Sequence, residues 1–177
     1  LSKSEDELFA GLHSKHRNVI RKAEKENVQI KMGKDFFDDC YCLIEETFRR
    51  QKKSFLSFEE LSDLHVALNG NIEYFIAMKD YIMQGGAILV WNKDYASYYL
   101  FGGSIDHPFT GSLNLLQWKA ICEMKNRGVA FYDFLGARLD PEKGSKLEGI
   151  QRFKERFGGD LETGYLWKYI YKPFKYF

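Results

Sequence analysis

The fold is decided by residues 114–135, which have the sequence NLLQWKAICEMKNRGVAFYDFL. Asn114 opens a stretch that is apolar around much of its circumference until Gly128, a pattern typical of a helix buried against a sheet. The apolar run from Val129 to Leu135 predicts a buried strand, and a strand-like run over residues 95–101 precedes the helix. A strand, a helix and a second strand in this order predict a right-handed crossover between parallel strands.

Upstream of this crossover, the spacing of apolar residues changes from helical to strand-like at Ile72. Residues 72–79, 86–91 and 95–101 form three runs separated by short turns, which predicts an antiparallel meander. Together with the crossover, the meander predicts an α/β fold: a mixed, mostly antiparallel sheet flanked by helices. We expect a single domain over residues 1–177, because no repeat, low-complexity segment or linker interrupts the chain.

Helices are predicted on both sides of the meander. Ser4 with Glu7, and Ser57 with Glu60, have the capping-box spacing that marks a helix start. Residues 4–27 are expected to form one basic helix that leads into the domain. The other predicted elements are a strand over 28–32, a helix capped by Asp35, a helix from Ser57 to Gly70, a helix over 146–157 and closing strands over 161–171.

Composition excludes several classes of protein. The chain of 177 residues, 45% hydrophobic and 29% charged, suits one globular domain and excludes disordered and collagen-like proteins. Its 26 Lys and Arg against 25 Asp and Glu argue against a nucleic-acid-coating protein, and we expect no DNA partner. Cys40, Cys42 and Cys122 lack zinc-site spacing, so we expect no metal and reduced thiols in a cytoplasmic protein. No apolar run approaches the ~20 residues of a membrane span.

One face of the first predicted helix is cationic. The basic side chains opposite its apolar side are Lys15, Arg17, Arg21, Lys22 and Lys25. The planar fork of arginine suits phosphate oxygens, so this face is a candidate site for a diphosphate or a nucleic-acid backbone, with a solvated helix face as the alternative. His16 lies on the apolar side, where a hydrogen-bonded core histidine is favoured over a catalytic base.

Charged residues also fall among apolar ones near the C-terminus. Lys154 lies in the apolar arc of the last predicted helix, so its ammonium must reach solvent, pair with a carboxylate or point into a polar cavity. Asp133 interrupts an apolar strand and is expected near the core, where a structural ion pair or backbone hydrogen bonds would satisfy it, with a direct catalytic role as the alternative. Tyr98, Tyr99 and Tyr132 are candidates for lining a pocket, although aromatic strand residues more often serve packing.

The connection before the buried helix, residues 102–113, bears on cofactor use. It lacks the compact glycine-rich turn on which acetyltransferases of the mixed-sheet fold hold the pyrophosphate of acetyl-CoA. Pro108 supplies no amide donor, although Ser112 and Asn114 leave some anion-binding capacity at the helix start. The connection therefore does not favour acetyl-CoA as a cofactor.

Several segments, taken in order, resemble the Fem family of aminoacyltransferases that build peptidoglycan cross-bridges, specifically their C-terminal, acetyltransferase-like (GNAT-type) half. The resemblance covers almost the whole chain and rests on KHRNVIRKA at 15–23, YLFGGS at 99–104, LQW at 116–118, YDFLG at 132–136 and GIQRFKERFG at 149–158. It implies transfer of an amino acid from aminoacyl-tRNA to an amine on a nucleotide- or lipid-linked cell-wall precursor, with no further cofactor.

The resemblance also implies roles for individual residues. Phe153 and Lys154 match a functional Phe-Lys pair, and we expect the Lys154 ammonium to stabilise the oxyanion formed on the ester carbonyl or to contact the 3′ end of the tRNA. Arg17 and Arg21 match a basic segment expected to bind the phosphates of the precursor. Tyr132 and Asp133 are carried over as cleft-supporting residues, and Tyr99 is the remaining substrate-binding candidate.

The resemblance is to one half of a Fem protein, so we expect an N-terminal domain to be missing from this chain, along with the helical arm of some members. Two alternatives stay open. One is an N-acyltransferase of polysaccharide or cell-envelope biosynthesis that takes acyl-CoA, and the other is a non-catalytic half-domain that binds tRNA or a partner domain. The expected location is the cytoplasm, including the inner face of the membrane.

Overall fold

A five-stranded sheet forms the centre of the computed structural model, which describes residues 1–177 except 69, 93–95, 138–139, 164 and 166–177. In spatial order its strands are β1 (Gln29–Met32), β2 (Ile72–Lys79), β3 (Ile82–Trp91), β4 (Ala96–Ser104) and β5 (Phe131–Asp133). The first four pair antiparallel, and β5 joins β4 in parallel. The predicted meander and crossover are therefore confirmed.

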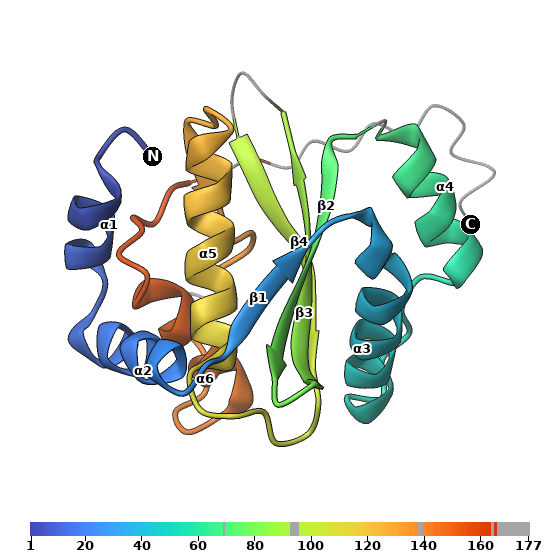
Figure 1. Cartoon of the computed structure of the whole chain (residues 1–177), viewed down its shortest axis with the longest axis horizontal. Coiled ribbons are helices and arrows are strands. Elements are labelled where there is room, and N and C mark those ends of the chain that lie inside the picture. The colour runs from blue at the N-terminus through green and yellow to red at the C-terminus, as the bar shows by residue number, and fades with distance from the viewer. Residues whose placement is uncertain (69, 93–95, 138–139, 164, 166–177) are drawn as a thin grey trace.

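Helices cover both faces of the sheet (Figure 1). One face carries α1 (Glu5–Gly11), α2 (Ser14–Lys25), α5 (Ser112–Asn126) and α6 (Lys146–Glu155), and the other carries α3 (Phe37–Arg50) and α4 (Phe58–Ala67). Successive strand residues point to opposite faces, so Phe75 and Ala77 join the core under α5, while Tyr74 and Ile76 join the core under α3.

The N-terminal segment differs from the prediction, because residues 4–27 form two helices rather than one. Leu12 is extended (φ −63°, ψ 147°), and the ring of His13 caps the start of α2. The Arg17 guanidinium donates hydrogen bonds to the carbonyl oxygens of Ala10 (2.8 Å) and Leu12 at the end of α1. Side-chain bonds to the backbone thus stabilise the break between the two helices.

The starts of α3 and α4 test two further predicted helix caps. The capping box of Ser57 with Glu60 is confirmed at the start of α4. Asp35 is not the cap of α3, since Lys34–Phe36 form a short 3-10 turn and Phe36 occupies the cap position without a side-chain hydrogen bond. The closing strands predicted over residues 161–171 lie largely outside the described residues.

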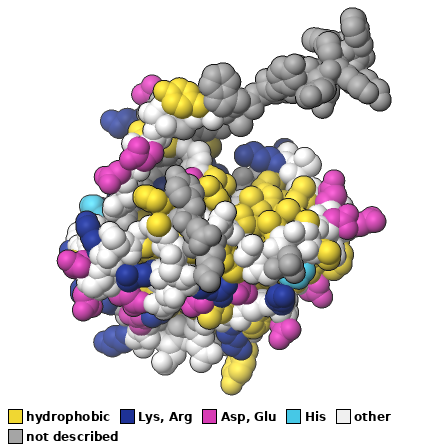
Figure 2. Space-filling view, turned by 90° about the horizontal axis from the view of Figure 1, so that it is seen from above, with side chains coloured by type: hydrophobic (Ala, Val, Ile, Leu, Met, Phe, Trp, Pro, Cys, Tyr) yellow, Lys and Arg dark blue, Asp and Glu magenta, His cyan; other side chains and the backbone are white. Residues whose placement is uncertain are grey.

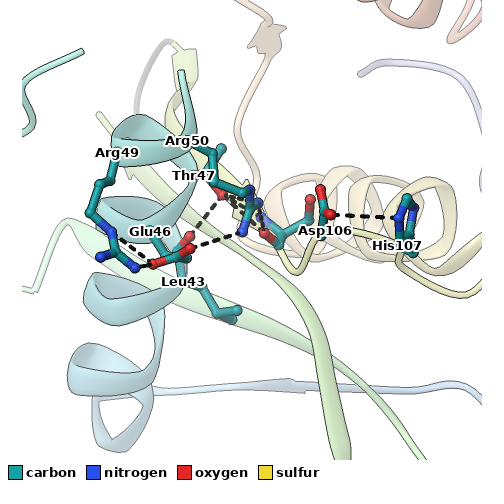
Figure 3. A network of polar contacts seen from close by, with 8 residues as sticks. Leu43, Glu46, Thr47, Arg49, Arg50, Asp106 and His107 are labelled. Carbon is teal, nitrogen blue, oxygen red and sulfur yellow. Dashed lines mark hydrogen bonds and ion pairs between the residues drawn. The ribbon is translucent and has the colours of Figure 1, made fainter. Parts of the chain in front are cut away.

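A polar network joins the end of β4 to α3 (Figure 3). The Thr47 hydroxyl accepts a hydrogen bond from the Ser104 N–H (2.9 Å), and the Arg50 guanidinium donates to the Ser104 carbonyl. The Glu46 carboxylate lies 3.6 Å from Arg50 and neutralises it in part. The helix approaches this closely because Gly103 has no side chain: a Cβ there would lie 2.6 Å from a carbonyl oxygen of α3.

Exposed hydrophobic side chains gather on the side of the molecule that carries α3 and α4, next to acidic side chains (Figure 2). In α4, Phe58 is 50% exposed and Val66 is 72% exposed. Within the described part of the chain, no helix combines the length and the apolar character that crossing a membrane requires.

Candidate functional site

The Lys154 ammonium of α6 lies at the end of β5. Its Nζ donates hydrogen bonds to the carbonyl oxygens of Leu135 (3.1 Å) and Gly136 (3.0 Å), which follow the last pair of the β4–β5 ladder, Tyr98 with Asp133. Burial lowers the pKa of Lys154, and the nearby Asp133 carboxylate opposes this by raising it. The half-buried ammonium therefore has two carbonyl partners among the described residues and can donate a third hydrogen bond.

The expectation that Asp133 enters the sheet near the core is wrong. The residue is exposed, because β5 is a three-residue strand at the edge of the sheet. Its Oδ1 accepts a hydrogen bond from the Leu135 N–H (2.6 Å), and Leu135 turns the chain with a φ of +56°. A short Asx-type turn of this kind satisfies the carboxylate locally and leaves its charge beside Lys154.

Two of the three candidate tyrosines, Tyr99 and Tyr132, pack against the core under α5. Burial raises the pKa of Tyr99 to about 12, and burial together with the neighbouring Tyr99 raises the pKa of Tyr132 well above its usual value. Gln117 donates a hydrogen bond to the Tyr132 hydroxyl. The Tyr99 hydroxyl lies so close to Gly102 that a Cβ there would be 1.8 Å from it. These contacts place both rings in the layer that supports the sheet.

The two arginines predicted to bind phosphate both contact α1. Arg17 donates to backbone carbonyls at the end of that helix, as described above. The Arg21 guanidinium lies over the ring of Phe9, 5.3 Å from its centroid. In this structure their contacts tie α2 to α1, and phosphate binding by either one stays a prediction.

A cavity of ≈ 490 Å³ opens between α2, the start of α5 and α6. Its lining residues are Lys15, His16, Asn18, Val19, Asn114, Gly149, Phe153 and Arg156. Among the predicted catalytic and substrate-binding residues, the cavity takes in Phe153 alone, while Lys154 points to the end of β5 instead. Arg156 was not among the predicted site residues, because it falls on the polar side of the helix predicted over residues 146–157.

His16 forms part of the cavity wall and is 4% exposed. Its ring packs against Phe153 (centroids 5.3 Å apart) and edge-on against Phe157 (4.6 Å). Its Nδ1 has no hydrogen-bond partner among the described residues, unlike the hydrogen-bonded histidine that was expected. Burial, with repulsion from Arg156 and His13, lowers the pKa of His16 to about 4, so the ring is neutral at pH 7.

The buried His16 ring is expected to make the fold sensitive to acid. An unfolded histidine has a pKa near 6.5 and the folded one about 4, so the unfolded chain takes up a proton first as the pH falls. The stabilisation by the neutral His16 ring is fully present above pH 6.5. Between pH 6.5 and 4 the free energy of unfolding falls by roughly 2–3 kcal/mol, because the unfolded chain binds a proton that the folded chain does not. Urea unfolding of the native chain and of His16→Leu at several pH values measures this, and equal pH dependence in both would contradict it.

The start of α5 lies directly against α2. Gly111 caps the helix with a φ of +93°, and a Cβ at this position would lie 2.3 Å from the Val19 carbonyl oxygen and 3.2 Å from the Ala23 side chain. Only glycine allows this approach without strain. The α2 backbone therefore packs directly against Gly111, the residue that caps α5.

Metal-binding clusters are absent from the described part of the chain, in which no three His, Cys, Asp or Glu side chains come together. The three cysteines are free thiols. Burial raises the pKa of Cys40 and of Cys122 to about 12, which makes both thiols poor nucleophiles.

Comparisons with known proteins identify similar sequences and folds. The model of the FemAB family matches residues 67–176, whereas no curated protein matches the chain. A crystal structure of FemX superposes with a TM-score of 0.76 at 19% identity, over 88% of this chain and 56% of that chain. An aminoglycoside acetyltransferase from an uncultured soil metagenomic sample, in complex with trehalose, gives a TM-score of 0.60 at 16% identity, over 85% and 99% of the two chains.

A third similar structure is the ribosomal-protein-alanine N-acetyltransferase of Brucella melitensis biovar Abortus 2308. It has a TM-score of 0.55 at 14% identity, over 80% of this chain and 99% of that chain. At these identities the three structures establish the acetyltransferase-type fold. The chain spans little more than half the length of the FemX chain.

Proposed function

Because this chain belongs to the FemAB family, we propose that it is the acyl-transferring half of an enzyme that moves an amino acid from aminoacyl-tRNA to an amine of a peptidoglycan precursor. The observation that carries this proposal is the placement of Lys154, a half-buried ammonium held by two carbonyl oxygens where the β4–β5 ladder ends. An ammonium fixed in this way is suited to stabilising negative charge on a reacting carbonyl.

The reaction forms one bond and breaks another. The acceptor amine attacks the ester carbonyl carbon, a C–N bond forms and negative charge develops on the carbonyl oxygen. The ester C–O bond then breaks, and the ribose oxygen of the tRNA leaves with the proton that the amine gives up. The third N–H of Lys154 donates to the oxyanion, while Leu135 and Gly136 hold the ammonium so that little reorganisation is needed.

Asp133 contributes to this role through its charge. Burial alone favours the neutral amine of Lys154, which would be a weaker oxyanion partner, whereas the Asp133 carboxylate favours the ammonium. Exposed and bonded to the Leu135 amide, Asp133 acts on Lys154 rather than on the substrate. We therefore assign it a positioning and charge-balancing role.

The contact between α2 and α5 supports aminoacyl-tRNA over acyl-CoA as the donor. The Val19 carbonyl oxygen lies against Gly111 at the helix start, where its partial negative charge disfavours the pyrophosphate of CoA. The acetyltransferases of similar fold keep acyl-CoA as the second candidate donor.

Calorimetry on the full-length protein separates the two donors. We expect aminoacyl-tRNA to bind and acetyl-CoA to give no binding heat at micromolar concentration. Micromolar binding of acetyl-CoA would overturn the tRNA-dependent proposal in favour of a CoA-dependent N-acyltransferase. A matched titration with uncharged tRNA shows how much of the affinity comes from the RNA itself.

A further inference from the structure

The cavity between α2, α5 and α6 is lined by two cationic side chains, Lys15 and Arg156, that the proposed chemistry does not use. We propose that this cavity binds a phosphate group, supplied by an RNA strand or by a nucleoside diphosphate. The inference rests on the proposed function, since both phosphate sources are parts of the substrates of such an enzyme. It assigns the binding to Lys15 of α2 and to Arg156, which caps the C-terminal end of α6.

The charges around the cavity favour an anion. Lys15 and Arg156 supply two cations, Asn18 and Asn114 supply amide donors, and the lining residues include no carboxylate. The acidic side chains of α6 are engaged elsewhere in the described structure. These contacts are an ion pair from Glu148 to Arg152 (2.6 Å) and a hydrogen bond from Gln151 to Glu155 (3.0 Å). Neither of these carboxylates lines the cavity.

His16 provides a second, independent indication of a ligand. Its ring lines the cavity and is 4% exposed, and its Nδ1 has no hydrogen-bond partner among the described residues. Buried polar atoms are nearly always hydrogen-bonded, so this nitrogen leaves a polar group without a protein partner in a residue that lines the cavity. A neutral imidazole carries one N–H, which suits a phosphate oxygen as acceptor.

The start of α5 adds to the same site. Asn114 lies in the first turn of this helix and lines the cavity with its side-chain amide. The arginines suggested by the sequence, Arg17 and Arg21, contact α1 instead, so the phosphate site is shifted to Lys15 and Arg156.

Binding measurements on the full-length protein test the proposal without requiring turnover. The variants are Lys15→Gln and Arg156→Gln, and the control is Lys34→Gln, which removes one exposed charge before α3 and does not line the cavity. The probes are a labelled RNA hairpin with a single-stranded 3′ tail, followed by fluorescence anisotropy, and uridine 5′-diphosphate, followed by calorimetry. Thermal unfolding of every variant verifies that it folds.

We expect each cavity variant to bind at least one probe about tenfold more weakly, while the control stays within twofold. If RNA supplies the phosphate, the slope of log K, where K is the association constant, against log salt concentration should become less steep by about 0.7 for each lost single-strand phosphate contact. Weakening of the hairpin alone assigns the site to RNA, and weakening of the diphosphate alone assigns it to a nucleotide. Unchanged affinity for both probes overturns the proposal.

The same measurements keep this proposal separate from the proposed function. If the native protein transfers no amino acid but Arg156→Gln weakens RNA binding, the phosphate site is supported and the proposed function is contradicted. If the native protein transfers amino acids but every variant binds both probes as well as it does, the proposed function is supported and the phosphate site is contradicted.

Discussion

Replacing Lys154 with Met is expected to lower the rate of amino-acid transfer about a hundredfold or more, with little change in affinity for either substrate. Met keeps the length and much of the volume of the side chain but removes the charge and all three N–H donors. Loss of one donor to an oxyanion typically costs this much, because the interaction is made only in the transition state. Single-turnover transfer by the full-length protein measures it.

Two further variants separate catalysis from structure, because Lys154 also holds the end of β5 through Leu135 and Gly136. Lys154→Arg keeps the charge and the ability to bond both carbonyls, so it should retain more activity than Lys154→Met at equal thermal stability. Lys146→Met removes an exposed lysine from the start of the same helix and should transfer at the native rate. Native transfer by Lys154→Met would exclude the oxyanion role.

Replacing Gly111 with Ala is expected to destabilise the fold by roughly 2–4 kcal/mol, from a positive φ and from overpacking. The new Cβ would lie 2.3 Å from the Val19 carbonyl oxygen, so α2 must move away from α5. Gly70→Ala is the matched control: its φ of +91° is nearly the same, but nothing lies within 4 Å of a Cβ there. The control should lose only about 1 kcal/mol.

Urea denaturation of the two glycine variants measures this difference directly. Equal losses for Gly111→Ala and Gly70→Ala would mean that α2 does not pack on the start of α5 as described. A displaced α2 also carries Lys15 and His16 away from α6, so Gly111→Ala should weaken phosphate binding as well.

Sequence patterns predicted the sheet well because alternation and burial are local signals. The run over residues 72–79 has the bounds of β2, since alternate side chains enter the two cores. The break between α1 and α2 gave no such signal. The apolar arc continues through Leu12, and the Arg17 bond to the Ala10 carbonyl that stabilises the break depends on three-dimensional placement.

The candidate site was predictable only in part. The helical wheel correctly placed Lys154 away from full solvent exposure, and the resemblance singled out its neighbour Phe153. The cavity itself depends on contact between chain segments about 140 residues apart, such as the hydrogen bond from the His13 N–H to the Arg156 carbonyl (2.9 Å). Periodicity within one helix carries no information about that contact. Asp133 was misplaced because an edge strand exposes residues that a central strand would bury.

Mass spectrometry of a peptidoglycan precursor, incubated with the full-length protein and either aminoacyl-tRNA or acyl-CoA, tests the proposed transfer most directly. We predict that the precursor gains the mass of one aminoacyl residue with charged tRNA and gains nothing with acyl-CoA. A gain with acyl-CoA alone would contradict the proposed donor. Retention of tRNA with no gain from either donor would contradict catalysis and identify a binding half-domain.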